Sequence, residues 1–153
     1  LVTIIWTLDI TAYNKSVFTL VCSGMMLPMA FAFSKLYKTQ WKIEENPLQP
    51  LGMILNIAQL FYFPFLIFIL IKSPEYFIMT YAIITGAHFF PYFWFYNEKA
   101  YAFAGGIISV GSLIISLMVS TDKIYYIPAM TALLLCVLGI SLYQSVRKHK
   151  PLI

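Results

Sequence analysis

Long uncharged apolar runs alternate with short polar segments along the whole chain. Five of these runs are about 20 residues long, and they cover residues 16–34, 51–71, 76–97, 100–121 and 124–146. A helix that crosses a bilayer needs about 20 predominantly apolar residues. A shorter apolar segment, residues 1–11, looks like the end of one more helix. The pattern therefore predicts six transmembrane helices, of which the first is truncated at its N-terminus.

The predicted fold class is an all-α integral membrane bundle. We expect helices at about 1–12, 16–37, 51–71, 76–97, 100–120 and 124–146, within a single domain that covers residues 1–153. Short polar loops between them imply that consecutive helices are antiparallel. The longest connection, residues 37–50, contains the densest charge and two prolines, which prevent a continuous helix there.

Composition excludes a water-soluble domain. Hydrophobic residues make up 61% of the chain and charged residues 10%, whereas a soluble domain carries about 25% charged residues. The net charge of +4 comes from residues between the apolar runs, so the expected partner is the lipid bilayer and not nucleic acid. Cys22 and Cys136 lie inside apolar runs and are expected to act as small hydrophobic residues. No metal or cofactor is expected.

The basic residues divide unevenly between the two sides of a six-helix bundle. Seven would lie on one side: Lys35, Lys38, Lys42, Lys99, Arg147, Lys148 and Lys150. Three would lie on the other: Lys15, Lys72 and Lys123. Because basic residues favour the cytoplasmic side, we expect both termini to be cytoplasmic.

His88 is the only ionisable residue deep within a predicted helix, where such residues are costly and often functional. Helical spacing places Tyr81, Thr85 and Tyr92 on its face, and Asn56 and Gln59 lie one turn apart on the preceding helix. If the two faces meet, these six residues form a polar ligand-binding cluster. The alternative is that they hydrogen-bond between helices only to hold the bundle together.

Two further patterns concern helix packing. Pro28, Pro64 and Pro91 lie inside three consecutive predicted helices, and kinks at these positions could open a cavity. The predicted fifth helix carries small residues on one face, at Ala102, Gly105, Ser109, Ser112 and Ser116. Such a face lets another helix approach closely. The neighbour is expected from the same chain, or from a second copy in a homo-oligomer.

Three hypotheses about function follow. The first is a non-enzymatic bundle that binds, senses or passes a small molecule through the polar cluster. The second is an intramembrane enzyme that uses His88 as acid or base. The third is a structural or interaction protein. The chain has no CxxC, HExxH or phosphate-binding glycine motif, and no carboxylate lies deep in a predicted helix, which excludes a membrane aspartyl protease.

Two motifs carry a resemblance to a known family. They are ENPL at Glu45–Leu48 and GAHFFPYFWFY at Gly86–Tyr96. Both resemble an uncharacterised family of small bacterial multi-pass membrane proteins, and the similarity covers the chain from the second helix onward. The resemblance implies a bacterial cytoplasmic membrane protein. It implies no activity and no catalytic residues.

Overall fold

The computed structural model describes residues 1–36 and 49–149, and regular structure within these residues is helical throughout. The all-α class is therefore confirmed for this part of the chain. Four helical segments are long and apolar enough to cross a membrane: Ala12–Leu36, Pro50–Lys72, Lys99–Met118 and Thr121–Ser145. Contacts divide the chain into two compact units, Leu1–Phe77 and Ile78–Ile153, which we describe separately. The single domain stays a prediction.

In the first unit, the first helix is shorter than predicted. α1 covers Val2–Thr7 instead of residues 1–12, and the backbone becomes extended at Leu8. Thr11 then forms the N-cap of α2 (Ala12–Gly24), where its side-chain oxygen accepts a 3.3 Å hydrogen bond from the Asn14 N–H. Because an N-cap residue has non-helical backbone angles, the preceding helix cannot continue through it. The prediction for α1 was wrong for this reason.

Lys15 lies inside α2, although its charge predicted a loop. Its Nζ donates a 3.3 Å hydrogen bond to the main-chain oxygen of Trp6. That oxygen belongs to the last turn of α1, where carbonyl groups have no partner within their own helix. A cation at this end of a helix is favourable. The lysine therefore stabilises the end of α1, and α2 begins at residue 12 and not at residue 16.

Hydroxyl groups on one face of α2 connect it to its neighbours. Ser16 and Thr19 are fully buried. The Trp6 indole Nε1 donates a 3.0 Å hydrogen bond to Thr19 Oγ1. Ser16 Oγ lies 3.3 Å from the main-chain oxygen of Pro74, the first residue of the short 3₁₀ helix η2 (Pro74–Tyr76). These contacts hold both α1 and η2 against α2.

The second predicted helix, 16–37, is divided in the structure. α2 ends at Gly24, Met25 forms a turn, and α3 covers Met26–Leu36. Pro28 stands four residues after Gly24, so it cannot donate a hydrogen bond to the Gly24 carbonyl, and its ring crowds that carbonyl. The break lies where the proline disturbs the helix.

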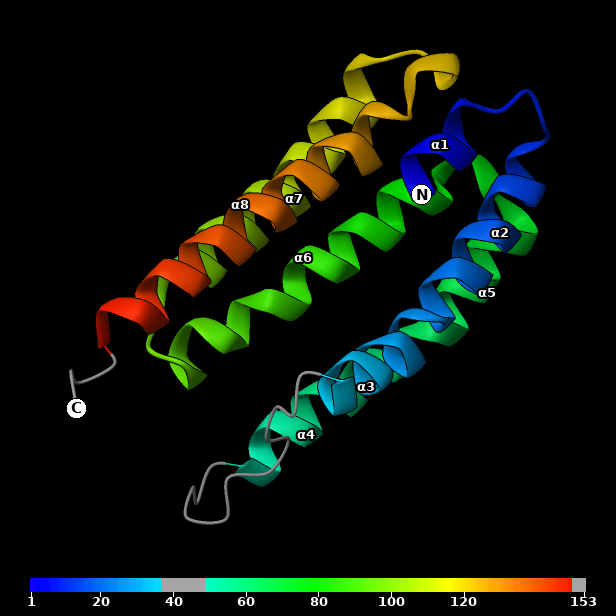
Figure 1. The fold of residues 1–153 in the computed structure, drawn as a ribbon. Coiled ribbons are helices and arrows are strands. Elements are labelled where there is room, and N and C mark those ends of the chain that lie inside the picture. Colours follow the sequence, from blue (N-terminus) through cyan, green and yellow to red (C-terminus); the bar gives the residue numbers. More distant parts are fainter. Residues whose placement is uncertain (37–48, 150–153) are drawn as a thin grey trace. The chain divides into compact units, whose positions relative to one another are not determined.

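The third predicted helix, 51–71, is also divided. α4 (Gln49–Ala58) leads through the 3₁₀ helix η1 (Gln59–Tyr62) into α5 (Phe63–Lys72). Pro64 lies in the first turn of α5, where a missing N–H is tolerated. α5 packs along α2 (Figure 1) and buries Leu66 and Leu70.

The second unit contains three longer helices, whose ends lie within three residues of the predicted bounds. They are α6 (Phe77–Phe95), α7 (Lys99–Met118) and α8 (Tyr126–His149). α7 and α8 form a side-by-side hairpin through the 3₁₀ helix η3 (Thr121–Lys123), as Figure 1 shows. Ile108, Ser112 and Ile127 are fully buried in this unit.

α6 is not among the four segments that are apolar enough to cross a membrane. It is uncharged and 19 residues long, but it contains His88, Pro91 and several Tyr and Trp side chains, which lower its mean hydropathy. Pro91 lies inside α6, which continues through it without a break. The helix that carries the predicted polar site is therefore uncharged but lies outside that set of four.

The hydrogen bond between Trp6 and Thr19 can be tested with a double-mutant cycle. We expect W6F and T19V to show a coupling energy of about 0.6 kcal/mol, and at most about 1.7 kcal/mol, the range measured for hydrogen bonds between membrane helices. The measurement is unfolding of the purified protein in mixed micelles. T7V is the control, because the Thr7 hydroxyl is exposed and bonds to Ile4 O of its own helix. Equal coupling of W6F with T7V would contradict the prediction.

Candidate functional site

The turn between α6 and α7 is built by the residues that end α6. Asn97 has a positive φ of 50°, which Asn tolerates better than other residues with a Cβ. Its N–H donates to Trp94 O at 3.3 Å, and the Glu98 N–H donates to Phe93 O at 3.1 Å. This pair of hydrogen bonds is the Schellman arrangement that ends many helices. It reverses the chain within three residues, so α7 starts at Lys99.

Glu98 connects this turn to α8. Ser145 Oγ donates a 2.7 Å hydrogen bond to Glu98 Oε2. Glu98 is also the N-cap residue of α7, where a carboxylate interacts favourably with the helix dipole. The turn is thus held to the C-terminal half of α8 by a hydrogen bond to a charged group, which is stronger than a neutral one.

α6 and α7 approach each other closely where small residues meet. A Cβ added at Gly86 would lie 2.7 Å from Gly105 O and would also collide with Ser109 Oγ. A Cβ added at Gly105 would lie 2.6 Å from Gly86 O. Ser109 Oγ donates a 3.2 Å hydrogen bond to the main-chain oxygen of Ile83 on α6. Glycine at both positions is therefore needed for this crossing.

Three tyrosines gather beside the turn, and we call Tyr92, Tyr96 and Tyr101 the tyrosine cluster. The ring centroids of Tyr92 and Tyr96 are 5.7 Å apart, and those of Tyr96 and Tyr101 are 5.6 Å apart, both pairs stacked. Tyr92 and Tyr101 are 5.8 Å apart. Such aromatic pairs stabilise a fold beyond the area they bury. The cluster joins the end of α6 to the start of α7.

His88 lies against this cluster. Its ring centroid is 5.2 Å from that of Tyr92, with the rings nearly perpendicular, and 6.0 Å from that of Phe89. The predicted pairing of His88 and Tyr92 on one face of α6 agrees with this contact. The imidazole can donate and accept hydrogen bonds, so it supplies polar chemistry at the edge of an aromatic surface.

The Tyr92 hydroxyl is the exceptional group of the site. Tyr92 is only 6% exposed, and its Oη has no hydrogen-bond partner among the described residues. Leaving a buried polar group unpaired costs about 1–3 kcal/mol. A ligand group that pairs with this oxygen would recover that cost.

The other predicted site residues lie in different surroundings. Thr85 is half-buried, and its hydroxyl donates a 2.8 Å hydrogen bond to Tyr81 O of its own helix. Asn56 is exposed on α4 and donates to Gly52 O at 3.0 Å, while Gln59 begins η1. Asn56 and Gln59 belong to the first unit, so their meeting with His88 stays a prediction. The described residues contain no group of three His, Cys, Asp or Glu that could hold a metal.

Part of the small-residue face on α7 packs within the chain. Gly105 and Ser109 contact α6, and Ser112 is fully buried. Same-chain packing, one of the two expected neighbours, accounts for these three. A homo-oligomer through this face of α7, from Ala102 to Ser116, stays a prediction.

The family affiliation follows from comparison with known proteins. A family model matches residues 1–145, which is nearly the whole chain and includes α1. The chain belongs to DUF7010, a family of unknown function. No curated protein and no solved structure matches it. The predicted membership of an uncharacterised family is confirmed. Of the two motifs behind that prediction, Gly86–Tyr96 forms much of α6 and its turn, whereas Glu45–Leu48 lies outside the described residues.

Sequence reasoning missed two parts of this DUF7010 chain. The buried hydroxyls of Ser16 and Thr19 could have been found from their spacing with Ser23, which places all three on one helical face. Tyr96 and Tyr101 lie at the ends of apolar runs and resemble interfacial anchors. Their packing with Tyr92 depends on the turn at Asn97, which hydrophobic periodicity does not reveal.

The close crossing of α6 and α7 gives a matched test. We expect G105A to lower the free energy of unfolding by about 1–3 kcal/mol, the usual cost of overpacking, because its Cβ meets the Gly86 carbonyl. G106A is the control, since a Cβ at Gly106 meets nothing within 4 Å. Alanine also favours a helix over glycine, so G106A should leave stability unchanged or raise it. Equal stability of the two variants in detergent unfolding would contradict the crossing.

Proposed function

We propose that the chain is a multi-pass protein of the bacterial cytoplasmic membrane, with six spans and both termini in the cytoplasm. Support for the spans comes from the four apolar segments and from the length and neutrality of α6. α1 stands at the position of the first span. The seven basic residues on one side against three on the other support the orientation. The bacterial source is carried over from the resemblance.

The proposed function is the binding of a small, partly apolar molecule at His88 and the tyrosine cluster. The observation that carries it is the buried hydroxyl of Tyr92, which lies beside the His88 ring and has no hydrogen-bond partner in the part of the chain that the structure describes. Small-molecule sites are concave and mostly apolar, with a few polar groups that orient the ligand. Tyr81 and Thr85 would extend this surface along α6.

Binding is better supported than acid–base catalysis. A catalytic imidazole is normally oriented by a hydrogen bond to its second nitrogen. Described residues contact the His88 ring through Phe89 and Tyr92, both by aromatic contacts, and provide no such hydrogen bond. A ring held in this way can orient a ligand without holding a proton in place for transfer.

The orientation predicts the activity of reporter fusions. Alkaline phosphatase fused after Thr121 should be active, because this enzyme folds only outside the cytoplasm, and the same enzyme fused after Glu98 should be inactive. Green fluorescent protein fused after Glu98 should fluoresce. These assays are made in whole bacterial cells. The reverse pattern would overturn the proposed orientation without affecting the binding proposal.

The binding site predicts a specific response to Y92F. The variant removes an unpaired buried hydroxyl, so the ligand-free protein should be at least as stable as the wild type. Small aromatic alcohols, ketones and amides, assayed beside their parent hydrocarbons, should raise the melting temperature of the wild type more than that of Y92F. The hydrocarbons should act equally on both.

Y13F is the matched control, because Tyr13 is 49% exposed on α2 in the first unit. It should respond to every compound as the wild type does. The proposal fails if no polar compound distinguishes Y92F from the wild type and from Y13F.

A further inference from the structure

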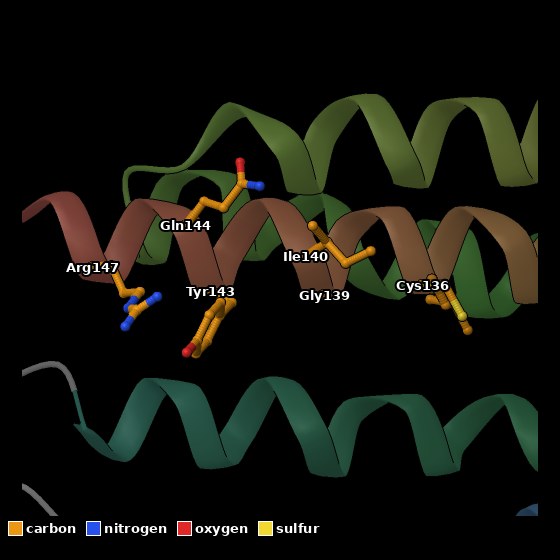
Figure 2. Close-up of a pocket in the computed structure, with 7 residues that line it drawn as sticks. Cys136, Gly139, Ile140, Tyr143, Gln144 and Arg147 are labelled. Carbon is orange, nitrogen blue, oxygen red and sulfur yellow. The ribbon is translucent and has the colours of Figure 1, made fainter.

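One face of α8 carries a shallow groove that plays no part in the site above. All of its lining residues come from α8: Leu135, Cys136, Gly139, Ile140, Tyr143, Gln144 and Arg147. Their spacing of three and four residues places them on neighbouring rows of one helical face. Figure 2 shows Tyr143 and Arg147 extending from the same side of the helix.

Gly139 forms the floor of the groove. A Cβ added there would meet no atom within 4 Å, so the glycine leaves open space instead of permitting a close helix crossing. Ile140 and Tyr143 beside it are 59% and 62% exposed. The groove is therefore a surface hollow between protruding side chains.

The groove is apolar at one end and polar at the other. Leu135, Cys136 and Ile140 line the first part. At the other end, the Arg147 guanidinium lies 5.3 Å from the ring centroid of Tyr143. This distance is within the range of a cation–π contact, which holds the charge over the ring and at the mouth of the groove.

Its length matches one leaflet of a bilayer. Arg147 stands eleven positions after Cys136, which corresponds to about 16 Å along a helix. Half of the hydrocarbon thickness of a bilayer is about 15 Å. The apolar segment Thr121–Ser145 ends two residues before Arg147, so the guanidinium would lie at the level of the lipid headgroups.

The charged residues that this end of α8 itself carries are basic, and the Glu98 carboxylate accepts a hydrogen bond from Ser145 on the same part of the helix. Lys148 and Lys150 follow Arg147 in the sequence, and no acidic residue follows Asp122. Arginine pairs well with phosphate oxygens, and basic pockets on the cytoplasmic side of membrane helices bind anionic headgroups. We propose that this groove binds an anionic phospholipid, with its phosphate at Arg147 and one acyl chain along Gly139.

Native mass spectrometry of the full chain can test this inference, which rests on the proposed membrane location but not on the His88 site. The protein is released from nanodiscs that contain equal amounts of phosphatidylglycerol and phosphatidylcholine. We expect phosphatidylglycerol to be the main bound lipid. R147Q should lower its retention about fivefold, the effect of one basic residue near the membrane surface.

K123Q is the control for charge, since it removes one positive charge from the opposite end of the same helical segment. It should retain phosphatidylglycerol as the wild type does. The proposal is overturned if R147Q retains as much phosphatidylglycerol as the wild type, or if K123Q loses as much as R147Q.

G139L tests the acyl-chain part of the groove. Its side chain would enter open space, and leucine favours a helix over glycine, so the variant should fold. It should bind less of both lipids. Unchanged lipid retention in G139L would overturn the placement of the acyl chain.

A second copy of the chain is the competing occupant of this face. Cys136 is exposed and free, so a second copy seated symmetrically on the groove would allow oxidation to a Cys136–Cys136 disulfide. We expect the protein to remain monomeric on oxidation with copper phenanthroline in nanodiscs, and C136S to behave identically. A dimer that is lost in C136S would overturn the lipid assignment. The reporter fusions separately decide whether the membrane orientation itself has failed.

Discussion

The backbones of α6 and α7 meet at Gly86 and Gly105, where neither position has room for a side chain, and the candidate site depends on this contact. In a bilayer, lipid tails are as apolar as the helix surfaces, so association relies on close van der Waals packing and hydrogen bonds. The crossing of α6 and α7 supplies the close packing. The hydrogen bond from Ser109 Oγ to the main-chain oxygen of Ile83 adds a polar contact between the two helices. With α6 fixed against α7, the next turns of the two helices bring Tyr92 against Tyr101.

In the first unit, side-chain hydroxyl groups hold the helices together instead of a glycine contact. α2 has no glycine at its contacts with α1 and η2. Buried hydroxyl groups on α2 contact these two elements instead. Thr19 accepts from the Trp6 indole, and Ser16 approaches the Pro74 carbonyl. Each hydroxyl also donates a hydrogen bond to a main-chain oxygen in the preceding turn of α2. Both hydroxyls therefore have hydrogen-bond partners within the chain. Among the described residues, the contacts of α2 with α1 and η2 leave no buried side-chain polar atom unpaired, so their role is structural.

The length of the uncharged apolar runs was enough to predict where α6, α7 and α8 lie, because polar residues such as Glu98 and Asp122 stand at the ends of these runs. The same rule failed at Lys15, whose charge lies within α2 because it caps the neighbouring helix α1. Helical spacing was enough to pair His88 with Tyr92. Helical spacing could not predict that Tyr101 packs against Tyr92, because the position of Tyr101 follows from the left-handed backbone of Asn97. Features that depend on one side chain reaching another element were those that the sequence pattern could not predict.

Two buried hydroxyls in the second unit lack partners among the described residues, Tyr92 Oη and Ser112 Oγ, but they are not equivalent. A serine hydroxyl in a helix can rotate toward the carbonyl four residues before it, as Ser16 does. Ser112 can therefore satisfy itself without any change in packing. A tyrosine hydroxyl lies at the end of a rigid ring and cannot reach its own backbone. Because Tyr92 is held by stacking against Tyr96 and by His88, its oxygen stays without a partner among the described residues, which makes it the stronger marker of a binding site.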